Sequence, residues 1–267
     1  MYAFAYHRPA TARQAAGLLA KKEDAKLLAG GHTLLPTMKQ RLASPAHLVD
    51  LGACADLRGI ERKGRNLVIG AMSTHAEVAA SPVVQEAIPG LAYLASHIGD
   101  PHVRHRGTIG GSVANNDPAA DYPAACLALG ATIVTNRRKI EADAFFTGLY
   151  ETALEEGEIV TKIAFPVASK AAYAKFRNPA SRYALVGVFV AKRGSDVRVA
   201  VTGAGEGGVF RWPDGEAALK VRFAPKSLDG VKASAKGVNA DMHADAEYRA
   251  HLIGVMAKEA VARAVGK

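Results

Sequence analysis

Apolar residues along the first two thirds of the chain occur in short runs separated by polar, glycine-bearing stretches. The run 26–29 predicts a buried strand, and the leucines and methionine of 34–42 follow it at helical spacing. Further strands are predicted at 48–51, 66–70, 131–135 and 159–165, and helices at 11–20, 74–80, 91–97, 122–129 and from Pro82 onward. The polar stretch 99–107 carries no predicted element.

The pattern changes near 168–171. Strands rich in β-branched and aromatic residues are predicted at 172–177, 184–192 and 197–202. A long helix over about 245–265 follows, with Leu252, Ile253 and Met256 on one face. Mixed helices and strands, followed by strands and a terminal helix, predict an α+β protein with two domains.

Composition and chain length limit the class of protein. The 267 residues, 49% of them hydrophobic, allow one large domain or two smaller ones. No apolar run reaches the roughly 18 residues needed to cross a bilayer, and the first residues lack the pattern of a secretory signal. We therefore expect a soluble, cytoplasmic protein without a membrane span.

The charge and the cysteine count narrow the function further. The net charge is +9, which suits a nucleic acid, an acidic partner or an anionic cofactor. The basic residues occur in small groups with no basic arm and no RNA-binding motif, so we expect no nucleic-acid partner. The two cysteines, Cys54 and Cys126, are too few for a [2Fe–2S] cluster, which needs about four ligands, usually cysteines.

Two glycine pairs stand out as candidate binding loops. Gly30-Gly31-His32-Thr33 lies between a predicted strand and a predicted helix, where backbone N–H groups can approach a pyrophosphate closely because no Cβ intervenes. Thr108-Ile109-Gly110-Gly111-Ser112 is followed by Asn115, Asn116, Asp117 and Asp121, whose amides and carboxylates suit sugar hydroxyls. Each segment alone also fits an ordinary polar turn. Together, nearly 80 residues apart, they could clamp the two ends of one long anionic ligand.

Two other motifs predict no further site. Gly203-Ala204-Gly205-Glu206-Gly207-Gly208 matches the dinucleotide fingerprint, but that fingerprint must open a helix directly. We expect Pro213 and Gly215 to break any helix there, so a loop or hairpin is predicted and no NAD site. His97, His102 and His105 cluster near Asp100, but their arrangement does not favour a metal site.

At the two glycine segments the sequence resembles the FAD-binding medium subunit of the molybdenum hydroxylases, the xanthine dehydrogenase and carbon monoxide dehydrogenase family. The matching segments are 28–36 and 108–121, and their order and separation are specific. The resemblance implies an FAD-binding domain over 1–170 with two lobes, about 1–55 and 56–170. It also implies a C-terminal α+β domain over 171–267, with an antiparallel sheet and a terminal helix.

The resemblance also implies which positions bind FAD. Residues 29–33 and Leu34 would contact the pyrophosphate and ribityl chain, and Thr108, Gly111 and Ser112 the other side. Asp121 would bind a polar group of the flavin or ribose. Ile98 and Val160 would pack near the flavin or adenine, Arg177 stands where some members have a lysine, and Tyr183 where others have an aromatic ring. Related subunits often have an acidic residue where Arg182 stands. The full implied set is Leu28, Ala29, Gly30, Gly31, His32, Thr33, Leu34, Ile98, Thr108, Gly110, Gly111, Ser112, Asp117, Asp121, Val160, Arg177 and Tyr183.

The function implied is electron transfer within a larger complex. A large partner subunit would carry the molybdenum cofactor, and a small partner would carry two [2Fe–2S] clusters that pass electrons to FAD. A dimer of such heterotrimers is expected. The cysteine count agrees that the clusters lie on another chain. Two alternatives stay open, a stand-alone flavoprotein oxidase and a non-catalytic assembly subunit that has lost its flavin.

Overall fold

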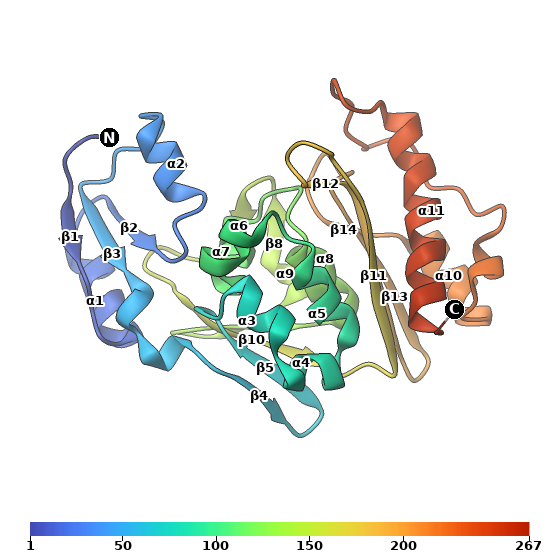
Figure 1. The fold of residues 1–267 in the computed structure, drawn as a ribbon, viewed down its shortest axis with the longest axis horizontal. Helices are drawn as coiled ribbons and strands as arrows, with labels where there is room; N and C mark the ends of the chain where they lie inside the picture. Colours follow the sequence, from blue (N-terminus) through green and yellow to red (C-terminus); the bar gives the residue numbers. More distant parts are fainter. Residues whose placement is uncertain (267) are drawn as a thin grey trace.

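The computed structural model describes residues 1–266, and its main sheets follow one another along the chain (Figure 1). An N-terminal parallel sheet lies at one end of the molecule, a central antiparallel sheet in the middle, and a C-terminal antiparallel sheet near the other end. This arrangement confirms the predicted α+β class with an antiparallel C-terminal sheet and a terminal helix. No helix within residues 1–266 is long and apolar enough to cross a membrane.

The N-terminal sheet positions the first glycine pair, which follows the end of its strand β2. Its elements are β1 (Ala5–His7), α1 (Ala12–Lys21), β2 (Ala25–Leu28), α2 (Leu34–Lys39) and β3 (His47–Asp50), followed by the short 3-10 turns η1 (Leu51–Ala53) and η2 (Ala55–Leu57). Strand β3 lies between β1 and β2 and runs parallel to both. The Thr11 side chain accepts from the N–H of Gln14 and so begins α1 as predicted.

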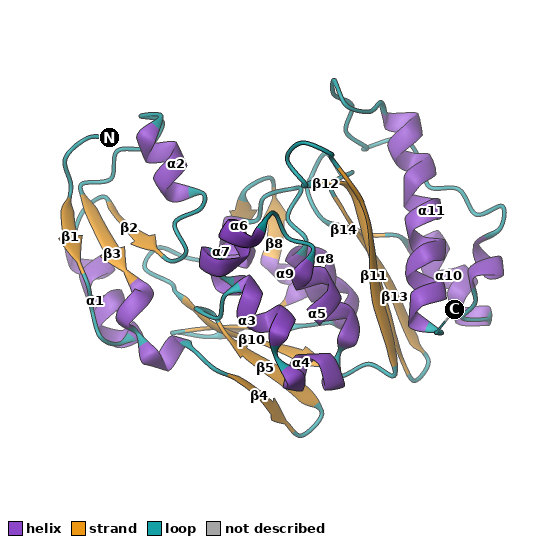
Figure 2. Ribbon diagram, viewed as in Figure 1, coloured by secondary structure: helices purple, strands orange, loops and turns teal. Residues whose placement is uncertain are grey.

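The central sheet carries most of its helices on one face (Figure 2). Its elements are β4 (Ile60–Lys63), β5 (Asn66–Gly70), α3 (His75–Ala80), α4 (Pro82–Ala87), α5 (Pro89–Ser96), α6 (Pro101–Arg106), α7 (Ile109–Asn115), α8 (Tyr122–Leu129), β6 (Thr132–Thr135), β7 (Lys139–Glu141), α9 (Ala142–Phe145), β8 (Phe146–Gly148), β9 (Glu151–Thr152) and β10 (Val160–Pro166). Strand β10 is the middle strand, between β5 and β6. Every residue of α8 is buried, which explains why its sequence is apolar on all sides.

The C-terminal sheet stands between two layers of helices. Its elements are β11 (Lys170–Arg177), β12 (Ala184–Arg193), β13 (Asp196–Thr202), β14 (Phe210–Arg211), α10 (Pro213–Val221), η3 (Pro225–Leu228) and α11 (Ala246–Ala264). Helix α11 packs against β11 and β12, while α5 and α8 of the central part contact the same sheet (Figure 1). The C-terminal sheet therefore packs directly on α5, which precedes the second glycine pair, and on α8, which follows it.

Three predictions from the sequence were wrong. The stretch 99–107 contains α6, which Pro101 begins and the Asp100 side chain caps by accepting from the N–H of Val103. The second glycine segment is the first turns of α7 rather than a loop, because the Thr108 side chain caps it. Pro213 begins α10 rather than breaking a helix, since its missing N–H is not needed in the first turn. The turn at 203–208 nevertheless runs into β14 and opens no helix, as predicted.

Candidate functional site

The fold brings the two glycine segments into direct contact. A Cβ on Gly30 would lie 2.2 Å from the carbonyl oxygen of Arg106 and 2.7 Å from Cα of Gly107. On the other side, a Cβ on Gly111 would lie 3.5 Å from Cβ of Ala29. Only glycine at residue 30 permits this backbone approach. Segments far apart in the sequence therefore form one site.

The first glycine segment presents free donors. Gly31 has a φ of 76°, a conformation that favours glycine. Within residues 1–266, the N–H groups of Gly31, His32 and Thr33 donate to no backbone acceptor. The His32 ring instead lies 3.0 Å from the carbonyl oxygen of His102, between Nε2 and O, and ties the segment to α6. Adjacent free amides before a helix are the donors that a pyrophosphate requires.

The second glycine segment differs, because its first amides are already used. The N–H of Ile109 donates to the carbonyl of Ser73, and that of Gly110 to the carbonyl of Ala71, at 3.0 and 2.9 Å. The N–H of Gly111 donates to the Thr108 hydroxyl at 3.2 Å. The two segments therefore differ in the backbone donors they offer, and a clamp on one long ligand stays a prediction. The second segment supplies small residues that pack closely against the first segment, and the first segment supplies the free amides.

The buried residue His75 packs against Gly107, directly before the second glycine segment. The N–H of His75 donates to the carbonyl of Gly107 at 2.9 Å, and a Cβ on Gly107 would lie 2.5 Å from Nε2 of the His75 ring. Burial lowers the pKa of His75 to about 4. The ring is therefore neutral near pH 7 and packs as a rigid support.

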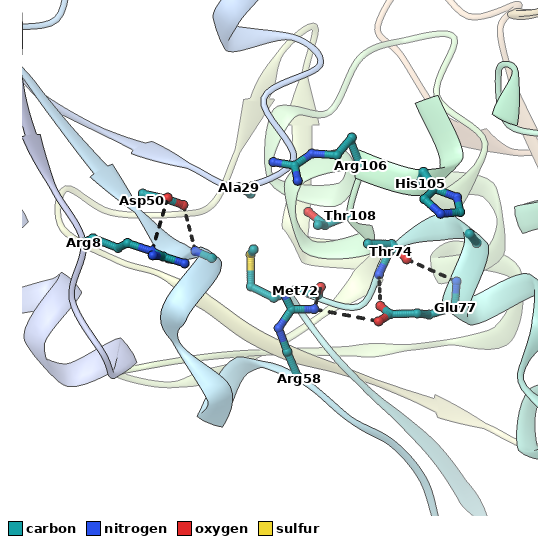
Figure 3. A pocket seen from close by; sticks show the side chains of 12 residues that line it. Arg8, Ala29, Asp50, Arg58, Met72, Thr74, Glu77, His105, Arg106 and Thr108 are labelled. Carbon is teal, nitrogen blue, oxygen red and sulfur yellow. Dashed lines mark hydrogen bonds and ion pairs between the residues drawn. The ribbon is translucent and has the colours of Figure 1, made fainter. Parts of the chain in front are cut away.

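A cavity of about 430 Å³ borders the two segments through Ala29 and Thr108 (Figure 3). The guanidinium groups of Arg8, Arg58 and Arg106 line it, and only two carboxylates accompany them. Asp50 lies 3.9 Å from Arg8 (Oδ2 to Nε), and Glu77 lies 3.8 Å from Arg58 (Oε1 to Nη1). A ligand held by the loops would therefore border a space of net positive charge, which favours an anion.

Asp121 lies at the junction with the C-terminal sheet, where its carboxylate has protein partners. Lys175 Nζ lies 2.9 Å from Oδ1 and donates to Oδ2 at 3.0 Å, and the Tyr173 hydroxyl donates to Oδ1 at 2.5 Å. Both charged side chains are 4% exposed. Lys175 also donates to the carbonyl of His97 at 3.3 Å. The pair therefore links β11 to α5 and α8, and a flavin contact for Asp121 stays a prediction.

Lys175 was missed by the sequence analysis, which selected Arg177 instead. The two residues would share a face of a regular strand, but the pairing of β11 with β12 shifts between Phe176 and Arg177. The extra residue of this bulge, Leu185, lies on β12, and Arg177 is exposed where β11 ends. A lysine two positions after a buried tyrosine was the available signal, because a lysine on a buried face requires an acidic partner.

The resemblance also implies two apolar positions, Ile98 and Val160. Ile98 is partly buried, and its carbonyl accepts from Arg104 Nη1 in α6 at 3.0 Å. Val160 is buried at the start of β10. The next residue, Thr161, accepts the N–H of Ala71, whose carbonyl accepts the N–H of Gly110. Val160 is therefore connected to the second glycine segment through backbone hydrogen bonds, and Ile98 to α6 through the Arg104 side chain.

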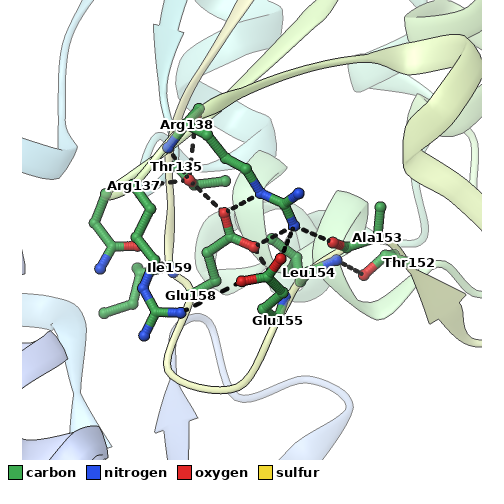
Figure 4. Close-up of polar contacts among 10 residues, drawn as sticks. Thr135, Arg137, Arg138, Thr152, Ala153, Leu154, Glu155, Glu158 and Ile159 are labelled. Carbon is green, nitrogen blue, oxygen red and sulfur yellow. Dashed lines mark hydrogen bonds and ion pairs between the residues drawn. The ribbon is translucent and has the colours of Figure 1, made fainter.

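An ion-pair cluster fixes the start of β10 (Figure 4). Arg138 donates to Glu158 through Nε at 2.9 Å and Nη2 at 3.0 Å, and the Thr135 hydroxyl donates to the same carboxylate at 2.8 Å. The Arg138 hydrogen bond is the largest cause that lowers the pKa of Glu158 to about 2. The carboxylate is therefore charged near pH 7.

The geometry of this site suits the pyrophosphate of a dinucleotide. The free amides, the close glycine contact and the positively charged cavity together fit FAD. Within the described residues, no group of three or more His, Cys, Asp or Glu side chains could hold a metal ion. The family model described as the FAD binding domain in molybdopterin dehydrogenase matches residues 2–168. The chain belongs to this family.

Proteins similar to this chain match it along nearly its whole length. The carbon monoxide dehydrogenase medium chain of Hydrogenophaga pseudoflava is 37% identical, over 97% of this chain and 96% of that protein. The nicotine 6-hydroxylase medium subunit of Paenarthrobacter nicotinovorans is also 37% identical, over 98% and 97%. A solved structure of the Hydrogenophaga pseudoflava dehydrogenase has a TM-score of 0.87 at 38% identity and covers 99% of this chain and 98% of its own.

Proposed function

We propose that this chain is the FAD-binding medium subunit of a molybdenum hydroxylase, an oxidoreductase subunit that relays electrons. The observation that carries the proposal is the contact between Gly30 and Gly107 beside the free amides of 31–33. Bound FAD would accept electrons from the iron–sulfur clusters of a partner and pass them to an external acceptor. The substrate chemistry belongs to another chain.

The residues of this chain bind and orient the cofactor. The amides of 31–33 would bind the pyrophosphate, Gly110 and Gly111 would allow close packing on the opposite side, and Thr108 would add a hydroxyl. The pair formed by Asp121 and Lys175 would hold the C-terminal sheet, and with it the loop that carries Tyr183, at a constant distance from the loops. Electron transfer through a bound cofactor depends on its position and electrostatic surroundings, which a rigid protein frame supplies.

The proposal includes two partner subunits. Cys54 and Cys126 are both buried, and they are too few to ligate a [2Fe–2S] cluster in the usual way. The names of the relatives, medium chain and medium subunit, support a small iron–sulfur partner and a large molybdenum partner. A dimer of such heterotrimers and a cytoplasmic location remain predictions.

The test is the visible absorbance of the purified chain, titrated with FAD and then desalted. We expect flavin absorption bands that persist at about one FAD per chain. A chain that takes up no FAD would refute the proposal and favour the flavin-free assembly subunit. An FAD-loaded chain that oxidises substrates rapidly without partners would instead favour the stand-alone oxidase.

A further inference from the structure

Two residues other than glycine have left-handed backbone conformations at the end of α7. Such conformations are unfavourable for residues with a Cβ, most of all for bulky ones, and they concentrate at functional sites. These two are Asn116 and Tyr150; Arg182 lies in the turn between β11 and β12, and the other two lie in the N-terminal part. Across residues 1–266 the complete set is Asp24, Arg41, Asn116, Tyr150 and Arg182.

Tyr150 is the bulky member of this set. It lies at the tip of the β8–β9 hairpin with a φ of 55° and a side chain that is 59% exposed. The hairpin tip is fastened to the end of α7: Asn116 Nδ2 donates to the carbonyls of Gly148 and Glu151 at 2.9 and 2.8 Å, and the carbonyl of Asn116 accepts from the N–H of Tyr150 at 3.3 Å. The strained backbone therefore has a defined position at the C-terminal end of α7, the helix that the second glycine segment begins.

The Tyr150 hydroxyl points to the same segment. It donates to Asp117 Oδ2 at 3.3 Å, and Asp117 Oδ1 accepts from the N–H of Ala119 at 2.8 Å. Asp117 follows α7 directly after the Asn116 cap. The carboxylate therefore has a fixed orientation, and the phenol is placed relative to the glycine segment through it.

A second exposed tyrosine approaches from the C-terminal sheet. Tyr183 is 51% exposed and follows Arg182, whose φ is 63°. The buried side chain of Asn178 accepts from the N–H groups of Ala180 and Ser181, and the N–H of Asn178 donates to the carbonyl of Tyr183. This turn joins β11 to β12 and presents the ring from a different part of the molecule.

The two rings share one electrostatic environment. Burial, followed by the Asp117 charge, raises the pKa of both Tyr150 and Tyr183 above the usual value. Both phenols are therefore neutral near pH 7, and the charge of Asp117 acts on both. Neutral aromatic faces beside a single anion suit a planar, uncharged ring system such as isoalloxazine.

We propose that Tyr150 contacts the flavin ring and forms, together with Tyr183, an aromatic pair that borders it from two parts of the molecule. The inference rests on the proposed function. The Tyr150 ring is mostly exposed, so it contributes little to the protein core. Packing of this ring on a ligand would explain why the protein keeps Tyr150 in a strained backbone conformation.

The test compares Tyr150→Gly and Tyr150→Phe with Arg41→Gly as the matched control, since Arg41 has a φ of 62° and follows α2 in the N-terminal part. Each full-length variant is measured for the Tm of the FAD-free protein, the Kd for FAD, and the fluorescence of bound FAD. Glycine relieves left-handed strain, so both glycine variants should have a Tm about 2–4 °C above wild type.

We expect Tyr150→Gly to weaken FAD binding about tenfold and to brighten bound FAD, because a stacked ring is lost. Tyr150→Phe should bind FAD within about threefold of wild type, and Arg41→Gly should leave both measurements unchanged. Unchanged FAD binding and fluorescence in Tyr150→Gly would overturn the inference, as would a lower Tm, which would show a structural role. A wild-type chain that binds no FAD would refute the proposed function itself, and the flavin contact with it.

Discussion

The contact between the two glycine segments makes Gly30→Ala the sharpest test of the site. The added methyl would lie 2.2 Å from the carbonyl oxygen of Arg106, so the segments must separate by about 1 Å before the clash is relieved. Both clashing partners are backbone atoms, and no side chain can rotate away. The separation should destabilise the protein by about 1–3 kcal/mol, as overpacking does elsewhere.

The larger effect should fall on FAD binding. A pyrophosphate that packs against the second segment would move away from the amides of 31–33 when the segments separate, and each hydrogen bond lost costs about 1.5–3 kcal/mol. The loss of two such bonds weakens binding at least about 100-fold, because each 1.4 kcal/mol is tenfold. The assay is a titration of the FAD-free protein with FAD, followed by flavin fluorescence at constant ionic strength, with stability measured by thermal denaturation.

Gly17→Ala is the matched control. Gly17 lies within α1, and no atom lies within 4 Å of a Cβ built there. That variant should gain up to about 1 kcal/mol of stability, the usual difference between alanine and glycine in a helix, and should bind FAD normally. A folded Gly30→Ala protein whose Kd for FAD stays within about threefold of wild type would refute the reasoning.

Three further predictions concern the frame of the site. Lys175→Met should lower the free energy of unfolding by about 3–5 kcal/mol because it leaves the buried Asp121 charge unpaired. Adding Asp121→Asn should recover part of this loss. The double-mutant cycle is measured by denaturant unfolding, and additive effects would contradict a coupled pair. The pKa of Glu158 is lowered to about 2 from 4.5, so the stability from its bond with Arg138 is complete above about pH 4.5 and is lost as the pH falls toward 2. Glu158→Gln should flatten the pH dependence of Tm in that range, and an unchanged slope would show that other carboxylates dominate. Gly111→Trp should fill the site and abolish FAD uptake, and a folded variant with stoichiometric FAD would count against the clamp.

Long elements with a clear period could be predicted from the sequence. Helix α11, the strands β11 to β13 and the apolar helix α8 lie close to where the pattern placed them. Helix α6 was missed because none of its residues is buried and most of them are basic or histidine, so it has no apolar period. Its start signal, Asp100 before Pro101, was nevertheless present in the sequence.

The sequence by itself determined which residues could bind a phosphate, because glycine pairs beside a strand end and a helix start have local physical reasons to be there. Only the tertiary structure decided how they act. It placed Gly30 against Gly107, used the amides of Ile109 and Gly110 for internal hydrogen bonds, and paired Asp121 with a lysine 54 positions away. Such outcomes depend on strand register and on a bulge, which are set by packing between distant segments rather than by any local pattern.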